Sequence, residues 1–239
     1  MKNIAVVALV GLASGSIGVA NAAAGDSTVS IGYAQIHSKG LKDMVNYYGG
    51  AIANIDASDV GDAITAGGFT ANDLNVSGHT DKYKDPKGLN LKYRYEIDDN
   101  WGVIGSFTYA WDDYNAHANA SANISGISAG ASLKGKLKAK YFSINVGPTY
   151  RFNEYVSAYV MGGIAHSKYD ANGSLDSYAN GKSIHIGSLS ESKDKTAFSY
   201  GAGLQFNPYK NIAIDVAYEG SGSGDWKTSG FNVGVGYSF

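Results

Sequence analysis

Apolar and polar residues alternate without interruption along residues 88–96, which read G-L-N-L-K-Y-R-Y-E. Leu89, Leu91, Tyr93 and Tyr95 share one parity, and the residues between them are polar or charged. Because a β-strand sends successive side chains to opposite sides, this stretch predicts a strand with one apolar and one charged face. A soluble sheet could solvate the charged face, so the pattern in the rest of the chain must decide its environment.

Seven further stretches predict strands, namely residues 29–36, 101–111, 142–151, 155–165, 198–206, 212–219 and 231–239. Alternation is weak in 155–165, so its faces stay unassigned. Connections after the second, fourth and sixth of the eight stretches are short, and the others are longer. This asymmetry is typical of outer-membrane barrels, which have short periplasmic turns and long extracellular loops. The chain therefore predicts an all-β fold, an eight-stranded antiparallel up-and-down transmembrane β-barrel with long extracellular loops.

Two details refine this prediction. Aromatic residues stand at the ends of the apolar faces, as Trp101 with Trp111 and Phe231 with Phe239, where they would form the two interfacial girdles of a barrel. Pro148 lies inside the fourth stretch, although proline removes a donor from the strand ladder. Its position near a short turn predicts a β-bulge at the periplasmic rim.

The N-terminus has the three parts of a secretory signal peptide. Lys2 supplies the positive start, residues 4–12 are apolar apart from one glycine, and Ala20-Asn21-Ala22 is a small-x-small cleavage signal. We expect residues 1–22 to be removed, with cleavage as late as residue 24, and residues 23–239 to form the barrel.

Composition narrows the possible chemistry. The chain has no Cys, which excludes a disulfide framework and a thiolate nucleophile or metal ligand. Its formal net charge of −2 gives no reason to expect a nucleic-acid partner. The 32 Gly and 18 Tyr favour strands over helices, in keeping with the alternating stretches.

Six charged residues fall on the inward faces of the predicted strands: Lys92, Arg94, Glu96, Arg151, Asp215 and Glu219. Eight strands leave room in the lumen for side chains and not for a wide pore. Since an unpaired buried charge is costly, we expect these groups to neutralise one another in a structural network. The alternative is a proton or ion path, or a catalytic carboxylate site.

Four lysines, Lys134, Lys136, Lys138 and Lys140, alternate at period two and lead into the fourth stretch. They fall on the same face of the strand as the apolar residues Phe142, Ile144 and Val146, which we interpret as lipid-facing. All four lysines should therefore project from the outer wall, just above the apolar part of the barrel. We expect this ladder to contact lipopolysaccharide phosphates or acidic host polymers through charge attraction. The alternative is a solvated strand extension whose charges discourage aggregation.

Other candidate sites are weaker. Asp56, Asp59 and Asp62 in the first long connection do not match the spacing of a calcium loop, which favours a polar loop with one short helical turn. None of the five histidines has metal-ligand spacing to another His, Asp or Glu, so no metal and no cofactor is expected. His166 and Ser167 would point to opposite faces of a strand, which argues against a hydrolase pair.

Four motifs resemble the Ail/Lom/PagC/OmpX family of enterobacterial outer-membrane proteins. They are G-L-N-L-K-Y-R-Y-E at 88–96, W-G-V-I-G-S-F at 101–107, G-P-T-Y-R-F-N at 147–153 and G-V-G-Y-S-F at 234–239. The resemblance implies an eight-stranded barrel whose extracellular loops serve adhesion, invasion, intracellular survival or complement resistance. Phe239 is similar to the C-terminal signal that the barrel-assembly machinery recognises. The first connection, about residues 38–87, is longer than is usual in the family.

These observations predict a monomeric, non-enzymatic surface protein of the bacterial outer membrane. Its barrel would be the anchor, and its loops would bind host extracellular-matrix, cell-surface or complement-regulating proteins. Three alternatives remain: an outer-membrane lipid-modifying or protein-cleaving enzyme, a small channel, and a soluble lipocalin-like barrel whose apolar faces line the interior.

Overall fold

The computed structural model describes residues 24–54, 58, 60, 62, 71–124 and 126–239. The predicted signal peptide, residues 1–22, and the candidate ligands Asp56 and Asp59 lie outside the described residues. Within the described ranges, no helix is long and apolar enough to cross a membrane.

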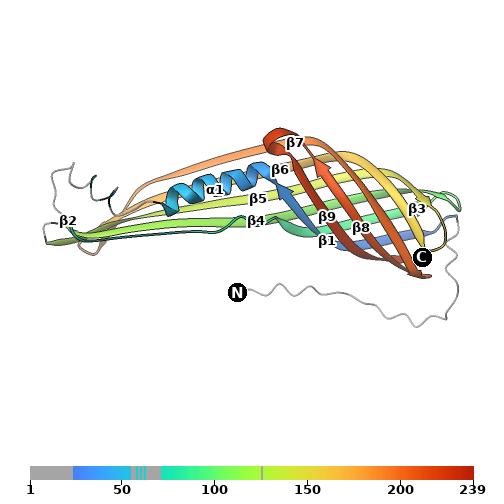
Figure 1. The fold of residues 1–239 in the computed structure, drawn as a ribbon, viewed down its shortest axis with the longest axis horizontal. Coiled ribbons are helices and arrows are strands. Elements are labelled where there is room, and N and C mark those ends of the chain that lie inside the picture. Colours follow the sequence, from blue (N-terminus) through green and yellow to red (C-terminus); the bar gives the residue numbers. More distant parts are fainter. Residues whose placement is uncertain (1–23, 55–57, 59, 61, 63–70, 125) are drawn as a thin grey trace.

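The chain folds mainly into long antiparallel strands (Figure 1). In order, the elements are β1 Ser27–Ser38, α1 Lys39–Ala53, β2 Ala71–Thr80, β3 Lys87–Glu96, β4 Trp101–Ile124, β5 Ile127–Arg151, β6 Val156–Ala179, β7 Lys182–Tyr209, β8 Ile212–Ser221, the 3-10 helix η1 Gly224–Trp226 and β9 Thr228–Ser238. Eight strands form a ring in the order β1, β3, β4, β5, β6, β7, β8, β9, which closes because β9 pairs with β1. The predicted eight-stranded barrel is confirmed. β2 lies outside the ring and, among the described strands, pairs with β4 alone.

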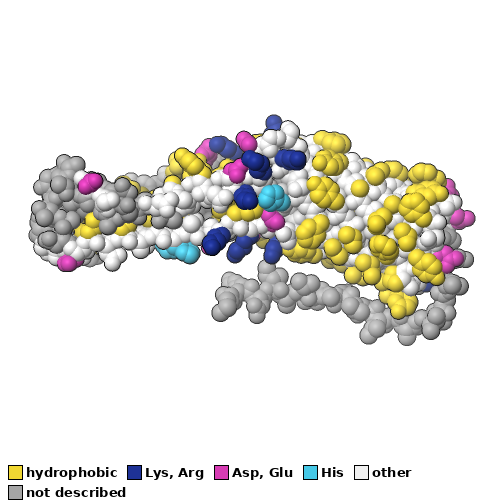
Figure 2. All heavy atoms as spheres, in the orientation of Figure 1, with side chains coloured by type: hydrophobic (Ala, Val, Ile, Leu, Met, Phe, Trp, Pro, Cys, Tyr) yellow, Lys and Arg dark blue, Asp and Glu magenta, His cyan; other side chains and the backbone are white. Residues whose placement is uncertain are grey.

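The barrel carries its apolar residues on the outside. On β3, Leu91 is 47% exposed, whereas its neighbours Lys92 and Arg94 are 4% and 2% exposed. Figure 2 shows hydrophobic side chains covering the visible wall at one end of the molecule. We call this outward-facing surface of the ring the apolar band. A continuous exposed apolar surface of this size needs lipid around it, and it contradicts a lipocalin-like barrel with its apolar faces inside.

The faces of β6, which alternation left unassigned, are set by two large residues that point inward. Tyr159 and Met161 are buried in the lumen, while Val160 and Ile164 are exposed on the wall. A β-carbon at position 203 of the neighbouring β7 would collide with the Tyr159 ring, so the glycine there makes room for it. Weak alternation thus arose because bulky side chains fill the lumen at this strand.

The second and third long connections are hairpins whose strands extend well beyond the predicted stretches. β4 and β5 stay paired from Trp101↔Tyr150 to Ile124↔Ile127, and β6 and β7 from Val156↔Phe206 to Ala179↔Lys182. The β6–β7 turn consists of Asn180 and Gly181, both at positive φ, as a tight two-residue hairpin turn requires. We call the parts of these strands beyond the apolar band, residues 112–140 and 168–197, the blade (Figure 1).

The bulge predicted at Pro148 is absent from the pairing around it. Pro148 lies opposite Val103 in a β4–β5 register that runs without a shift. On the other side, the register continues from Val146↔Gly162 to Thr149↔Tyr159. β5 and β6 thus accommodate the missing N–H of Pro148 by a short gap in their pairing, and β5 needs no extra, bulged residue.

The first connection begins with a helix much longer than the single turn predicted. Ser38 is the N-terminal boundary residue of α1, and its Oγ accepts a hydrogen bond from the backbone N–H of Leu41 at 3.4 Å. Leu41 and Val45 pack into a cluster with Tyr114, Leu137 and Tyr169 from the inner faces of β4, β5 and β6. Packing explains how a segment with glycines at positions 40, 49 and 50 stays helical. We call this cluster the cap.

Candidate functional site

Lys92 lies at the centre of the first charge cluster in the lumen. Its Nζ donates to the carboxylate of Asp215, to Asn232 Oδ1 at 2.5 Å and to Tyr159 Oη at 2.8 Å. Tyr159 in turn donates to Asp215 at 2.9 Å. The four residues come from four different strands, so the cluster ties β3, β6, β8 and β9 together across the interior.

The other lumen charges form two further clusters. Arg94 and Arg151 both contact the Glu96 carboxylate, at 2.6 Å and 2.5 Å. Glu219 accepts hydrogen bonds from Tyr141 at 2.6 Å, from Thr108 at 2.9 Å and from Ser143. The structure thus places all six predicted lumen residues inside the barrel.

The geometry of these clusters favours a structural role over an ion path or a catalytic site. Three cations face three carboxylates, and each carboxylate is engaged by close donors. Tyr141, which binds Glu219, is followed on the inner face of β5 by Ala139 and Leu137 of the cap. An apolar layer therefore lies directly above the charges and separates them from the blade end of the molecule.

The four ladder lysines are exposed on the outer wall of β5, on the face shared with Ile144 and Val146. Lys140 lies opposite Trp111, at the edge of the apolar band. Lys134 is six residues farther along, ~20 Å at the rise of an antiparallel strand. The ladder was predicted just above the band, but it extends well out along the blade.

Paired positions on neighbouring strands add to this basic surface. Lys140 lies directly opposite Lys168 of β6, and Lys138 lies opposite Asp170. The pKa of Asp170 is lowered, first by a hydrogen bond from Ser192 and then by the charges of Lys168 and Lys140. Figure 2 shows lysine and arginine side chains gathered where the apolar wall gives way to the blade.

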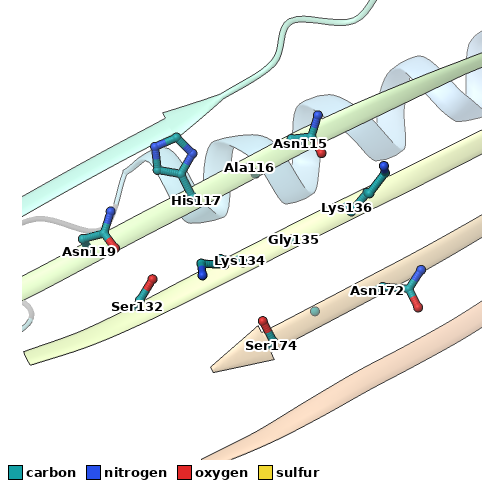
Figure 3. Close-up of a pocket in the computed structure, with 11 residues that line it drawn as sticks. Asn115, Ala116, His117, Asn119, Ser132, Lys134, Gly135, Lys136, Asn172 and Ser174 are labelled. Carbon is teal, nitrogen blue, oxygen red and sulfur yellow. The ribbon is translucent and has the colours of Figure 1, made fainter. Parts of the chain in front are cut away.

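Beyond this level, the outer face of the blade is hollowed into a shallow depression of about 440 Å³. Its lining includes His117 of β4, Lys134 and Lys136 of β5 and Asn172 of β6 (Figure 3). Small residues at positions 116, 135 and 173 form part of that lining, and α1 lies behind the sheet. Lys136 also forms an ion pair with Asp113 at 2.9 Å.

The histidines are distributed differently from what spacing along the chain suggested. His166 lies on the outer wall while Ser167 is buried on the inner face, so the two do not form a catalytic pair. His37 and His185 contact Asp85 and Asp176, each at 2.8 Å. His79 and His117, 38 positions apart in the sequence, lie side by side on β2 and β4. Only knowledge of the β2–β4 register could have found this pair.

Comparison with known proteins identifies the family of this barrel. A family model described as Enterobacterial Ail/Lom protein matches residues 50–239. The chain belongs to the Ail/Lom family. The attachment invasion locus protein of Yersinia enterocolitica, one such relative, is 37% identical over 189 residues, which cover 79% of this chain and 92% of the relative. The virulence membrane protein PagC of Salmonella typhimurium is 39% identical over 165 residues, 66% of this chain and 79% of the relative.

A solved structure of an Ail/Lom protein has the same architecture. The crystal structure of Ail from Yersinia pestis in complex with the heparin analogue sucrose octasulfate is 32% identical, with a TM-score of 0.54, and the match covers 90% of this chain and 99% of that one. The Ail/Lom chain described here is therefore an outer-membrane β-barrel protein, related to proteins of attachment, invasion and virulence. The prediction of this family from four motifs is confirmed.

Proposed function

We propose that this protein is a display scaffold of the bacterial outer membrane. After removal of the signal peptide, the monomeric barrel spans the membrane and the blade, with α1 and β2, projects outside the cell. The blade attaches the bacterium to acidic or sulfated host polymers, and the surfaces around it bind host cell-surface or complement-regulating proteins. The names of the relatives, which speak of attachment, invasion and virulence, support this proposal.

The observation that carries the proposal is the lysine ladder on the outer wall. Lys140 and Lys168 lie directly opposite each other, and like charges in such a pair destabilise a sheet unless an anion lies between them. Both lysines stand at the edge of the apolar band, which is the level of lipid phosphates in an outer membrane. Phosphate groups of lipopolysaccharide would supply that anion and hold the barrel at a fixed depth.

The outer half of the ladder faces a different environment. Lys134 and Lys136 line the depression on the blade, beyond the reach of the lipid headgroups (Figure 3). A sulfated polymer lying across the blade would meet their ammonium groups together with the amides of Asn115 and Asn172. The complex of Ail with a heparin analogue supports this choice of ligand class.

Neither an enzyme nor a channel fits as well. The lumen carboxylates are bound by lysine, arginine or hydroxyl donors, so they are poor candidates for a nucleophile or a general base. The lumen is filled by side chains such as Tyr159 and Met161 and is covered by the cap. We therefore propose a binding function without catalysis and without a conducting pore.

Replacing Lys134, Lys136, Lys138 and Lys140 together with glutamine should weaken heparin binding by about 10²- to 10³-fold at low salt. Each lysine near an anionic surface contributes about 1 kcal/mol, and salt screens this attraction. Binding of heparin to the protein in lipid nanodiscs measures the effect. A control variant removes the same number of charges elsewhere, at Lys39, Lys42, Lys182 and Lys210, and should bind normally. Equal binding by both variants would overturn the proposal.

Two half-ladder variants separate the two ligands. Substitution of Lys134 and Lys136 should mainly weaken heparin binding, whereas substitution of Lys138 and Lys140 should mainly weaken binding to lipopolysaccharide vesicles. Expression of the ladder variants in a non-adherent, serum-sensitive strain then connects each loss to adhesion or serum survival. If the unchanged protein gives no gain in either assay, the attachment function is wrong for this chain.

A further inference from the structure

His79 and His117 form a cross-strand pair on the exposed surface of the blade. They are directly opposite each other in the β2–β4 register, and the centroids of their rings are 5.4 Å apart at an interplanar angle of 38°. Both side chains are exposed, so their ring nitrogens can reach a ligand in solvent. β2 lies outside the barrel ring, and this pair is one of its links to β4.

The separation of the rings suits a shared metal ion. A Zn²⁺–imidazole bond is about 2.0–2.1 Å, which puts the ring centroid ~3.2 Å from the metal. Two imidazoles at a tetrahedral angle around one ion then have centroids ~5.2 Å apart. The 5.4 Å between His79 and His117 is close to this value, so both rings can bind one ion after small side-chain rotations.

The surroundings supply further polar groups. Asp81 follows β2, and its carboxylate accepts hydrogen bonds from Asn115 of β4 at 2.8 and 3.1 Å. Lys134 lies opposite His117 on the other side and adds an opposing positive charge. A dication here would thus be attracted by Asp81 and repelled by Lys134.

We propose that His79 and His117 chelate a divalent transition-metal ion, Zn²⁺, Ni²⁺ or Cu²⁺, and that the ion clamps β2 onto β4. Imidazole nitrogen suits these ions and not Ca²⁺ or Mg²⁺, which take oxygen ligands. Water or a donor from a bound partner completes the coordination shell, because two protein ligands leave positions open. The clamp would fix β2 against the blade, beside the ladder.

Calorimetric titration of the tag-free mature protein with Zn²⁺ tests the chelate directly. We expect one site per chain. His79→Gln and His117→Gln should each lower the Zn²⁺ affinity at least about tenfold, because each variant keeps one imidazole and lacks the second bond that makes the chelate. The double variant lacks both imidazoles and should show no Zn²⁺ binding at this site, whereas each single variant keeps only the weak binding of one imidazole. Small additive losses, or singles that bind like the unchanged protein, would overturn the proposal.

Two controls separate this site from other metal contacts and from the proposed polyanion function. His185→Gln should leave the affinity unchanged, and a loss there would place the ion at the His185–Asp176 contact instead. Lys134→Gln should tighten Zn²⁺ binding while it weakens heparin binding, whereas His79→Gln, whose residue does not line the depression, should keep heparin binding. Normal heparin binding by His79→Gln also shows that this variant is folded.

Hydrogen exchange gives a readout that does not depend on affinity. Zn²⁺ should slow exchange of the amides of β2 in the unchanged protein, because a bridged strand opens less often. The same ion should have no such effect in His117→Gln. Equal slowing in both proteins would contradict the clamp.

Discussion

Replacing Asp215 with asparagine should destabilise the barrel by about 3–5 kcal/mol, because the substitution leaves a buried ammonium group without its counter-charge. Lys92 and Asp215 are 4% and 1% exposed, so water cannot replace the lost partner. Asparagine has nearly the same shape as aspartate, and the loss therefore reports the charge and not a cavity. Urea unfolding in lipid vesicles measures the difference in the free energy of unfolding.

The paired substitution distinguishes a buried charge from lost packing. Adding Lys92→Met to Asp215→Asn should recover most of the stability, since apolar and neutral groups can replace a buried ion pair at little cost. Asp170→Asn removes a partly exposed carboxylate on the blade that lies 3.5 Å from Lys168, and should cost less than about 1 kcal/mol. If Asp215→Asn is as mild as this control, the lumen network does not hold the barrel together.

Leu41→Asp should release α1 from the blade while the barrel stays folded. Leu41 is 0% exposed in the cap, and deletion of such a side chain alone costs about 2–5 kcal/mol. A carboxylate in the same place adds the penalty of burying a charge, so the helix should leave the cluster instead. Limited proteolysis of the protein in nanodiscs should then show cleavage within Lys39–Ala53.

Tyr47 provides the matched control on the same helix. It is 73% exposed, so Tyr47→Asp introduces the same charge without entering the cap and should leave α1 resistant to protease. Planar-bilayer recordings extend the test to the lumen. The unchanged protein should conduct little in these recordings. In the protease test, equal sensitivity of Leu41→Asp and Tyr47→Asp would show that the cap does not hold α1.

The barrel could be predicted because lipid and lumen impose opposite demands on successive residues. Leu91 and Lys92 alternate for that reason, and the motif around them was enough to suggest the family. The blade has water on its outer face, so residues 112–124 carry Asn, Ala and Ser in place of an apolar stripe. Because the blade lacks this stripe, apolar–polar alternation could not predict that its residues form strands.

Sequence patterns could not predict contacts between residues that are far apart in the chain. The signs of the lumen charges suggested a network, but the partnership of Lys92 with Asp215 depends on how the barrel closes. α1 forms where glycines weaken the helical signal, because Leu41 and Val45 find a partner surface on β4, β5 and β6. The proximity of His79 and His117 likewise depends on a register between strands.

Labelling of single cysteines on intact cells tests most directly whether the blade is displayed outside the cell. The chain has no native Cys, so Lys182→Cys at the tip of the blade and Glu154→Cys in a short turn at the other end each give one reactive site. A membrane-impermeant maleimide should label Lys182→Cys on intact cells and Glu154→Cys only after the outer membrane is permeabilised. Labelling of Glu154→Cys but not Lys182→Cys on intact cells would contradict the proposed orientation and the display function built on it.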